Sequence, residues 1–278
     1  PSGAHMEPAL ASIEAGKHVI CEKPLEIQLD RADRIIAAAK ARNVRVAGIL
    51  QNRWKPENRA IKAAMQAGRF GKVAWAGSFT PWYRTDQYYE DGGWRGTWKW
   101  DGGGAIMNQS IHAIDLLQWI AGPVRRVSAY AASRIHPKIE VEDTLSCALQ
   151  FQSGAFGTIV GSTARYPGQP ARLEIGGENG TAISENGLKA FKFRAELPDD
   201  RALLESLNPD ASTASGKSNP AAIGYDGHRK NITAILESWD RGEEAETHAA
   251  ETRKGLAAVL AVYESARRDG APVDVAQG

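Results

Sequence analysis

The feature that most constrains this chain is a pair of short, continuously apolar runs, each preceded by a helical pattern. HVICE (18–22) and VRVAGIL (44–50) carry apolar residues at consecutive positions, which is typical of strands buried on both faces of a parallel sheet. The first run follows a helix predicted to begin at Ser2 and to end before Gly16, and the second follows a helix predicted over residues 30–42. This alternation predicts a doubly wound α/β sheet in the first part of the chain.

Beyond residue 55 the pattern changes to a succession of strands. A helix is predicted from Pro56 to Gly68, and an aromatic, glycine-rich loop over 81–101 leads into a helix over 102–121. Strands are predicted over 72–79, 124–132, 144–151, 154–163, 171–177, 181–186 and 188–193, a long polar loop over 205–222, and helices over 226–240 and 249–268. Short links at 152–154 and 178–180 favour hairpins.

Two domains follow from this change of pattern. Residues 1–55 are expected to form the parallel α/β unit, and residues 56–278 an α+β domain with a large mixed or antiparallel sheet. The last helix is a candidate to pack back on the first unit. A chain of 278 residues is long enough for two cores.

Charge and cysteine content exclude several classes of function. The 34 basic and 33 acidic side chains give a net charge of +1, so nothing in the balance favours nucleic acid or an anionic membrane as partner. Two cysteines are too few for a disulfide framework, and with no apolar run of membrane-spanning length a cytoplasmic protein is predicted. No group of His, Cys, Asp and Glu has the spacing of metal ligands.

Lys23 and Pro24 follow directly on the first apolar run. In doubly wound sheets ligands bind beyond the carboxyl ends of the strands, so the Lys23 ammonium is placed to reach that crevice, with Glu22 able to set its position. Pro24 fixes the chain direction, and a cis Lys23–Pro24 bond is predicted. Taken alone, a solvated surface lysine is the more frequent situation. Gln51, after the second run, borders the same crevice.

Asn108 and His112 lie four residues apart in the helix predicted over 102–121. This spacing places both side chains on one face of that helix, with Asp115 nearby. Taken alone, a single histidine in a helix more often has a structural role. The same holds for His228, at the start of a later helix.

These segments, in order, resemble the Gfo/Idh/MocA oxidoreductases. The resemblance is carried by PSGAH (1–5), CEKP (21–24), the polar-aromatic loop and GGGAIMNQSIHAIDLLQW (102–119), and it extends nearly to the end of the chain. It implies an N-terminal Rossmann domain that binds NAD or NADP, and a C-terminal domain whose sheet often forms a homodimer or homotetramer. Against that pattern the chain lacks a first strand and a G-x-G-x-x-G turn, so an N-terminal truncation is expected.

The resemblance implies hydride transfer between a nicotinamide and a secondary hydroxyl of a sugar, sugar nucleotide or cyclitol. The family pattern at the helix is Asp-x-x-x-His: His112 matches the histidine, and Asn108 replaces the aspartate. We expect His112 to transfer the hydroxyl proton, Lys23 to stabilise the alkoxide and place the substrate, and Asn108 to orient it. Lys23 as the base is the open alternative. Cofactor contacts are expected from Pro1, His5, Glu22, Lys23, Pro24 and Gln51.

The aromatic loop is a candidate for the substrate pocket, because aromatic faces beside charged groups suit a polyhydroxylated ring. The expected contacts are Arg84, Tyr89, Trp94, Arg95 and Trp98; packing at a domain or subunit interface explains the aromatic residues equally well. Within the family the loop most resembles enzymes that oxidise C3 of UDP-N-acetylglucosaminuronate. Two alternatives remain open: a non-catalytic regulator that senses a dinucleotide or sugar, and a truncated fragment that cannot bind cofactor.

Overall fold

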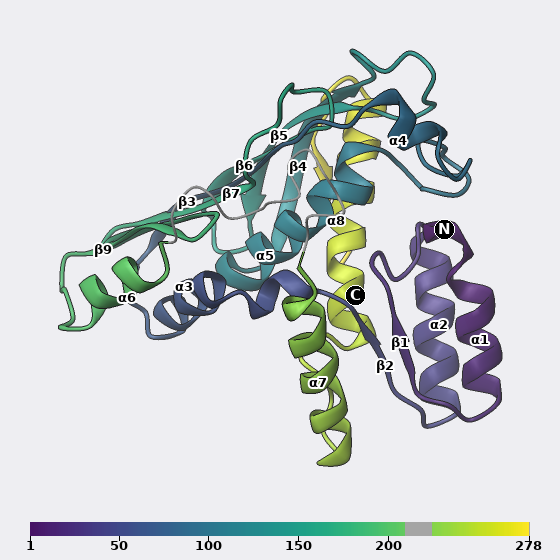
Figure 1. Cartoon of the computed structure of the whole chain (residues 1–278), viewed down its shortest axis with the longest axis horizontal. Coiled ribbons are helices and arrows are strands. Elements are labelled where there is room, and N and C mark those ends of the chain that lie inside the picture. Colours follow the sequence, from purple (N-terminus) through teal and green to yellow (C-terminus); the bar gives the residue numbers. More distant parts are fainter. Residues whose placement is uncertain (209–223, 278) are drawn as a thin grey trace.

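The first part of the chain is a small parallel α/β unit. In the computed structural model, which describes residues 1–208 and 224–277, β1 (Val19–Cys21) pairs in parallel with β2 (Val46–Gly48). Helices α1 (Met6–Glu14) and α2 (Leu29–Ala41) pack together beside the two strands (Figure 1). The parallel pairing confirms the α/β prediction.

Residues with positive φ follow the C-terminal ends of α1 and α2. Gly16 has φ of +71° just after α1, and Asn43 has φ of +52° just after α2, as expected for residues that end helices. Ser2, however, is not the cap of α1: residues Ser2–Ala4 form a separate 3-10 turn, η1, and α1 begins at Met6.

The second part of the chain is built on an eight-stranded mixed sheet. Its strand order is β10-β4-β5-β6-β3-β7-β8-β9, with β3 and β6 parallel and the other pairs antiparallel. The strands are β3 (Val73–Pro81), β4 (Val124–Ala132), β5 (Thr144–Phe151), β6 (Phe156–Ser162), β7 (Arg172–Gly177), β8 (Gly180–Glu185), β9 (Leu188–Phe193) and β10 (Val273–Asp274). The predicted hairpins β5–β6 and β7–β8 are confirmed. The two-residue β10 was not predicted.

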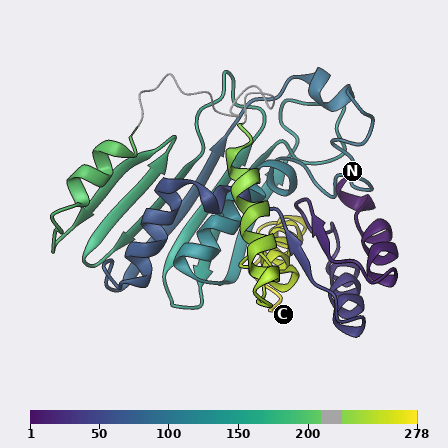
Figure 2. The same ribbon diagram turned by 60° about the horizontal axis from the view of Figure 1, so that its bottom comes forward.

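One face of this sheet is covered by helices. Along β5 the buried residues Leu145, Cys147, Leu149 and Phe151 alternate with more exposed ones, the pattern of a sheet packed on one side. Helices α3 (Pro56–Gln66), α5 (Ile111–Ala121) and α8 (Ala249–Arg267) lie on that side (Figures 1 and 2). They bury the apolar core between helices and strands.

Two C-terminal helices connect the parts. Helix α8 contacts β4, α2 and β2, and Arg253 of α8 pairs with Asp33 of α2 at 2.5 Å. Helix α7 (Asp226–Asp240) packs against η2 (Gln51–Trp54), the 3-10 turn that follows β2. The carboxyl ends of β1 and β2 are therefore held against the larger part of the chain. A further short helix, α6 (Asp200–Ser206), packs on β9.

The helix predicted over 102–121 has two sections. Residues Ala105–Ser110 form a π-helical turn, η3, and regular α-helix begins only at Ile111. The preceding loop also contains a short helix, α4 (Asp86–Glu90), which the sequence did not predict. A π turn inside a helix is uncommon and is frequent at functional sites.

Within the described residues, no helix has the length and apolar character needed to cross a membrane. Cys21 and Cys147 are buried free thiols. The predicted loop over 205–222 lies largely outside the described residues.

Candidate active site

Lys23 leaves the carboxyl end of β1 in a turn that is fixed by its neighbours. The Lys23–Pro24 peptide bond is cis, as predicted. His5, at the start of α1, binds the Pro24 carbonyl through its Nδ1 at 2.9 Å, and the Glu22 carboxylate accepts from the Lys23 backbone N–H at 3.2 Å. The turn directs the lysine side chain toward η3, on the larger part of the chain.

The Lys23 ammonium ends at Asn108. Its Nζ donates to the Asn108 backbone carbonyl at 2.7 Å, and a longer contact of 3.5 Å reaches the Asn108 side-chain oxygen. Burial lowers the pKa of Lys23, the nearby charges of Glu22 and Asp101 partly oppose this, and Arg95 adds to it. The predicted pair of Lys23 and Asn108 is thus brought together across 85 positions of sequence.

Asp101 is a site residue that the sequence analysis missed. It is 2% exposed, and its carboxylate accepts from the Asn108 side-chain amide at 2.6 Å and from the Gly96 backbone N–H at 3.0 Å. Burial raises the pKa of Asp101, and the two hydrogen bonds and Lys23 act in the opposite direction. The available signal was an acidic residue directly before Gly102-Gly103-Gly104 in an otherwise aromatic segment.

His112 lies at the start of regular α-helix, one turn beyond Asn108. Burial holds the pKa of His112 well below its usual range, and the charges of Lys23, Lys55 and His228 lower it further. Its Nδ1 is buried and has no hydrogen-bond partner among the described residues. His112 is therefore neutral near pH 7, and a neutral imidazole with an unpaired nitrogen is the form that can accept a proton from a bound hydroxyl.

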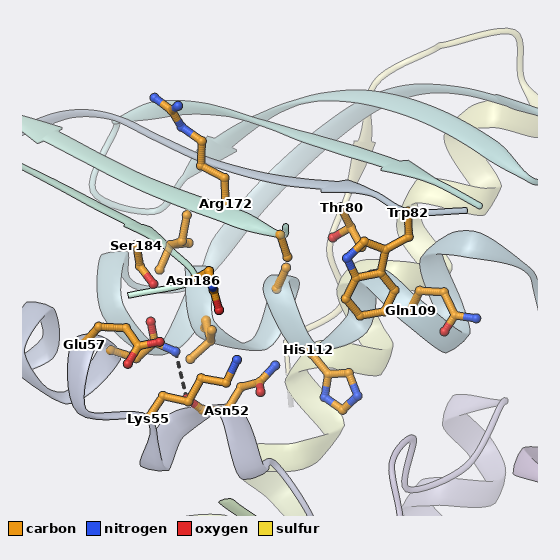
Figure 3. A pocket seen from close by; sticks show the side chains of 15 residues that line it. Asn52, Lys55, Glu57, Thr80, Trp82, Gln109, His112, Arg172, Ser184 and Asn186 are labelled. Carbon is orange, nitrogen blue, oxygen red and sulfur yellow. Dashed lines mark hydrogen bonds between the residues drawn. The ribbon is translucent and has the colours of Figure 1, made fainter. Parts of the chain in front are cut away.

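His112 also borders a cavity between the sheet and the helices (Figure 3). Trp82 and Thr80 come from the end of β3, Ser184 from β8, and Lys55 and Asn52 from the segment before α3 (Figure 3). The remaining lining residues are Glu57, Asn58, Gln109, Ala113, Leu116, Ala171, Arg172, Leu173 and Asn186. Figure 3 shows the Arg172 guanidinium turned away from the other labelled side chains.

Polar atoms in this cavity are ready to bind a ligand. Asn58 and Thr80 are 2% and 1% exposed, and within the described residues the Asn58 Oδ1 and the Thr80 Oγ1 have no hydrogen-bond partner. Unpaired buried polar atoms are costly unless something binds them. Together with the Trp82 ring, they suit a ligand that carries several hydroxyl groups.

The predicted contacts of the aromatic loop mostly pack within the protein and do not line this cavity. Tyr89 bonds Thr163 through its hydroxyl at 2.7 Å and is 8% exposed; Arg84 is 3% exposed and lies over Trp82. Arg95 stacks on Trp94, and Trp98 packs edge-on against Tyr263 of α8. Trp82 and Gln109, flanking this set in sequence, are the residues that reach the cavity.

The other predicted residues border the carboxyl ends of the strands or stabilise the helices. Gln51 follows β2, and among the described residues its Oε1, like the His228 Nδ1 of α7, is buried without a hydrogen-bond partner. Pro1 is exposed beside η1. Asp115 binds the buried Arg53 through both carboxylate oxygens, at 2.9 and 2.5 Å, and therefore has a structural role.

These features fit a nicotinamide dinucleotide. The carboxyl ends of parallel strands are where nucleotides bind in such sheets, and here Glu22, Lys23, Pro24 and Gln51 lie at those ends with unpaired polar atoms beside them. No group of three or more His, Cys, Asp and Glu in residues 1–208 and 224–277 is arranged to hold a metal ion.

Comparison with known proteins gives consistent matches over the whole chain. Residues 1–48 match the family model "Oxidoreductase family, NAD-binding Rossmann fold", and residues 58–183 match "GFO/IDH/MocA C-terminal domain". The 1,5-anhydro-D-fructose reductase of Ensifer adhaerens is 30% identical over 87% of this chain and 76% of its own length. The myo-inositol 2-dehydrogenase of Thermotoga maritima is 26% identical over 81% of this chain and 71% of its own length.

A solved structure is similar over the full chain. The WlbA dehydrogenase of Bordetella pertussis, in complex with NADH and UDP-GlcNAcA, superposes with a TM-score of 0.87 and 32% identity, covering 100% of this chain and 77% of that one. The resemblance inferred from the sequence motifs is therefore confirmed. The chain belongs to the GFO/IDH/MocA family of oxidoreductases, whose N-terminal domain has the NAD-binding Rossmann fold.

Proposed function

We propose that this chain is an NAD-dependent dehydrogenase or reductase that interconverts a secondary hydroxyl and a carbonyl on a sugar, sugar nucleotide or cyclitol. The observation that carries the proposal is the approach of Lys23, at the end of β1, to the segment that holds Asn108 and His112, beside a polar cavity. The relatives above are named as reductases and dehydrogenases, which favours an enzyme over a regulator.

Glu22, Lys23, Pro24 and Gln51 are the residues that we propose hold the nicotinamide end of the dinucleotide. When bound, that group supplies the acceptor or donor of the hydride. His5 contributes indirectly. Its Nδ1 lies 2.9 Å from the Pro24 carbonyl oxygen, and this hydrogen bond fixes the turn. Exposed Pro1 lies at the edge of this region.

His112 is proposed to accept the hydroxyl proton during oxidation and to return it during reduction. Its lowered pKa keeps the imidazole neutral, and its unpaired Nδ1 leaves a nitrogen without a competing donor. The Lys23 ammonium would stabilise negative charge on the same oxygen. Because burial lowers the pKa of Lys23 as well, Lys23 as the base remains the alternative mechanism.

The substrate is proposed to lie against Trp82 and to extend into the cavity beside His112. The unpaired atoms of Asn58 and Thr80 at this cavity suit ring hydroxyls. We keep Arg84, Tyr89, Trp94, Arg95 and Trp98 as proposed substrate contacts of the aromatic loop, whose shape their packing on protein groups also maintains. UDP-GlcNAcA, the sugar nucleotide bound to WlbA, and myo-inositol are the first substrates to test.

The test follows NADH formation from NAD⁺ with each substrate, between pH 5 and pH 9. His112→Asn and Lys23→Met are each expected to lower kcat by roughly 10²-fold to 10⁴-fold, while Lys40→Met, on the exposed face of α2, leaves it unchanged. The variant in which one limb of the pH–rate profile disappears identifies the base. NADH fluorescence checks that each variant still binds cofactor. Wild-type turnover that survives in both His112→Asn and Lys23→Met would refute the assignment.

We also propose that the chain forms two domains with a boundary near residue 55, and that copies of the chain form a homo-oligomer through the uncovered face of the large sheet. Tyr130 of β4 and Phe156 of β6 are 64% and 63% exposed, more than is usual for large apolar side chains on a sheet. Light scattering is expected to give the mass of a dimer or tetramer; a monodisperse monomer would contradict the second part.

A further inference from the structure

Asn108 occupies the position where the family pattern has an aspartate, and its side chain is hydrogen-bonded to the carboxylate of Asp101. Lys23 Nζ contacts the Asn108 side-chain oxygen at 3.5 Å, and the Asn108 amide nitrogen donates to Asp101 at 2.6 Å. The charged groups therefore lie at the two ends of one amide. We infer that Asp101 is a positioning residue of the Lys23 site: through Asn108 it fixes the amide orientation and supplies the negative charge that favours the ammonium form of Lys23.

The orientation of Asn108 follows from what Asp101 can accept. An ionised carboxylate has only acceptor positions, so the Asn108 amide must turn its nitrogen toward Asp101 and its oxygen toward Lys23. The second carboxylate oxygen accepts from the Gly96 N–H at 3.0 Å, which fixes the carboxylate itself. The Lys23 ammonium, which has only donors, requires the same orientation from the other side, so the two charged groups fix the amide together.

The ionisation of Lys23 depends on all the charged groups around its ammonium. The charges that act on it are Glu22 and Asp101, which favour the ammonium, and Arg95, which opposes it. Of the two acids, Glu22 has the larger effect on the pKa of Lys23, but its side chain is exposed and therefore screened by water and salt. Asp101 is 2% exposed, so its charge is the less screened of the two.

A purely structural role for Asp101 predicts different behaviour. Asp101 also closes its own loop through Gly96, and a residue that acted only there would affect stability without changing the ionisation of Lys23. The inference rests on the proposed function for its meaning, but the ionisation of Lys23 is measurable without any turnover.

The experiment is a pH titration of Lys23 by NMR in protein labelled with ¹³C-lysine, with the resonance assigned by its absence in Lys23→Met. Asp101→Asn is expected to lower the pKa of Lys23, because the charge that favours the ammonium is removed. Asp91→Asn, which changes an exposed carboxylate of the same loop that accepts from Gln87, serves as the matched control and is expected to leave the Lys23 pKa unchanged.

The exchanged pair Asp101→Asn with Asn108→Asp gives the decisive variant. In it the amide at 101 accepts from Gly96 and donates to the carboxylate at 108, so every hydrogen bond has a partner and the negative charge lies directly beside Lys23. The Lys23 pKa is expected to return to the wild-type value or above. An unchanged Lys23 pKa in folded Asp101→Asn, or no recovery of that pKa in the exchanged pair, would overturn the inference. If the pKa shifts occur as expected but the wild-type protein shows no turnover, only the proposed function would be contradicted.

Discussion

Glu142 is a buried carboxylic acid beneath the glycine run that precedes the π turn. Its side chain accepts from the Gly104 and Ile106 backbone N–H groups at 3.0 and 2.8 Å and from the Tyr263 hydroxyl at 3.1 Å, and it is 4% exposed. Burial raises the pKa of Glu142 to about 7 in spite of these bonds. The free energy of unfolding should therefore depend on pH through this one group.

The sign follows from proton binding. Between its usual pKa of 4.5 and about 7, Glu142 is protonated in the folded chain and ionised in the unfolded chain, so the folded state binds more protons. Stability from this group therefore falls as pH rises through that interval and is constant above it. Between pH 5 and pH 8 the expected loss is about 2.5 kcal/mol, at about 1.36 kcal/mol for each pKa unit.

Glu142→Gln should remove this pH dependence without unfolding the chain. The glutamine oxygen is able to keep the bonds from Ile106 and Tyr263, and Gly104 keeps a second partner because its N–H also lies 3.1 Å from the Tyr263 hydroxyl oxygen. A cost of about 1 kcal/mol is expected near pH 5 from the less favourable bonding. Near pH 8, where wild type carries the buried charge, the variant is expected to be the more stable protein.

Urea unfolding at pH 5 and pH 8 provides the measurement. His112, whose pKa is lowered, makes an opposite contribution that destabilises the fold below about pH 6.5, but it is common to both proteins and cancels in their difference. Glu140→Gln, two residues away and exposed, is the control and should keep the wild-type pH dependence. An equal change between pH 5 and pH 8 in wild type and Glu142→Gln would refute the reasoning.

Two further predictions concern other charges around the site. Arg53→Met leaves the buried Asp115 carboxylate without its partner and should cost about 3 to 5 kcal/mol of unfolding free energy, most of which Arg53→Met with Asp115→Leu should recover; a loss below 1 kcal/mol in urea unfolding would contradict this. Lys55→Gln removes one of the positive charges that lower the pKa of His112, so the acidic limb of the pH–rate profile should move to higher pH. The movement should not exceed about half a pH unit, because Lys55 is exposed and its charge is screened. A shift to lower pH would contradict the electrostatic account.

Local signals predicted most of the fold. The strands over 124–132, 144–151 and 188–193 begin and end where they were predicted, because one face of the sheet is buried and apolar residues recur along that face, most regularly in β5. Gly16 and Asn43 marked the ends of α1 and α2 because a left-handed conformation favours these residue types. Strands β1 and β2 were predicted too long, since a continuous apolar run does not show where pairing stops.

The site was only partly accessible to the same reasoning. Lys23 and His112 were identified from motifs. Asp101, which binds Asn108 beside Lys23, and Asn58 and Thr80, which line the same cavity as His112, were not, because they come from other segments of the chain. The aromatic loop was assigned to the substrate because its composition suits a sugar. In the structure Arg95 stacks on Trp94, and Trp98 packs on Tyr263 of α8; composition alone does not distinguish such packing from substrate binding.

Asn108 and His112 are presented by a segment that buried charges stabilise at three points. Glu142 binds its first turn at Gly104 and Ile106, Asp101 binds Asn108 in the middle, and Arg53 binds Asp115 one turn after His112. A π turn is less favourable than regular α-helix and persists where surrounding contacts fix it. Glu142 thus binds the start of the π turn and Asp101 binds the Asn108 side chain that faces Lys23, while His112, in the regular helix that follows, borders the cavity.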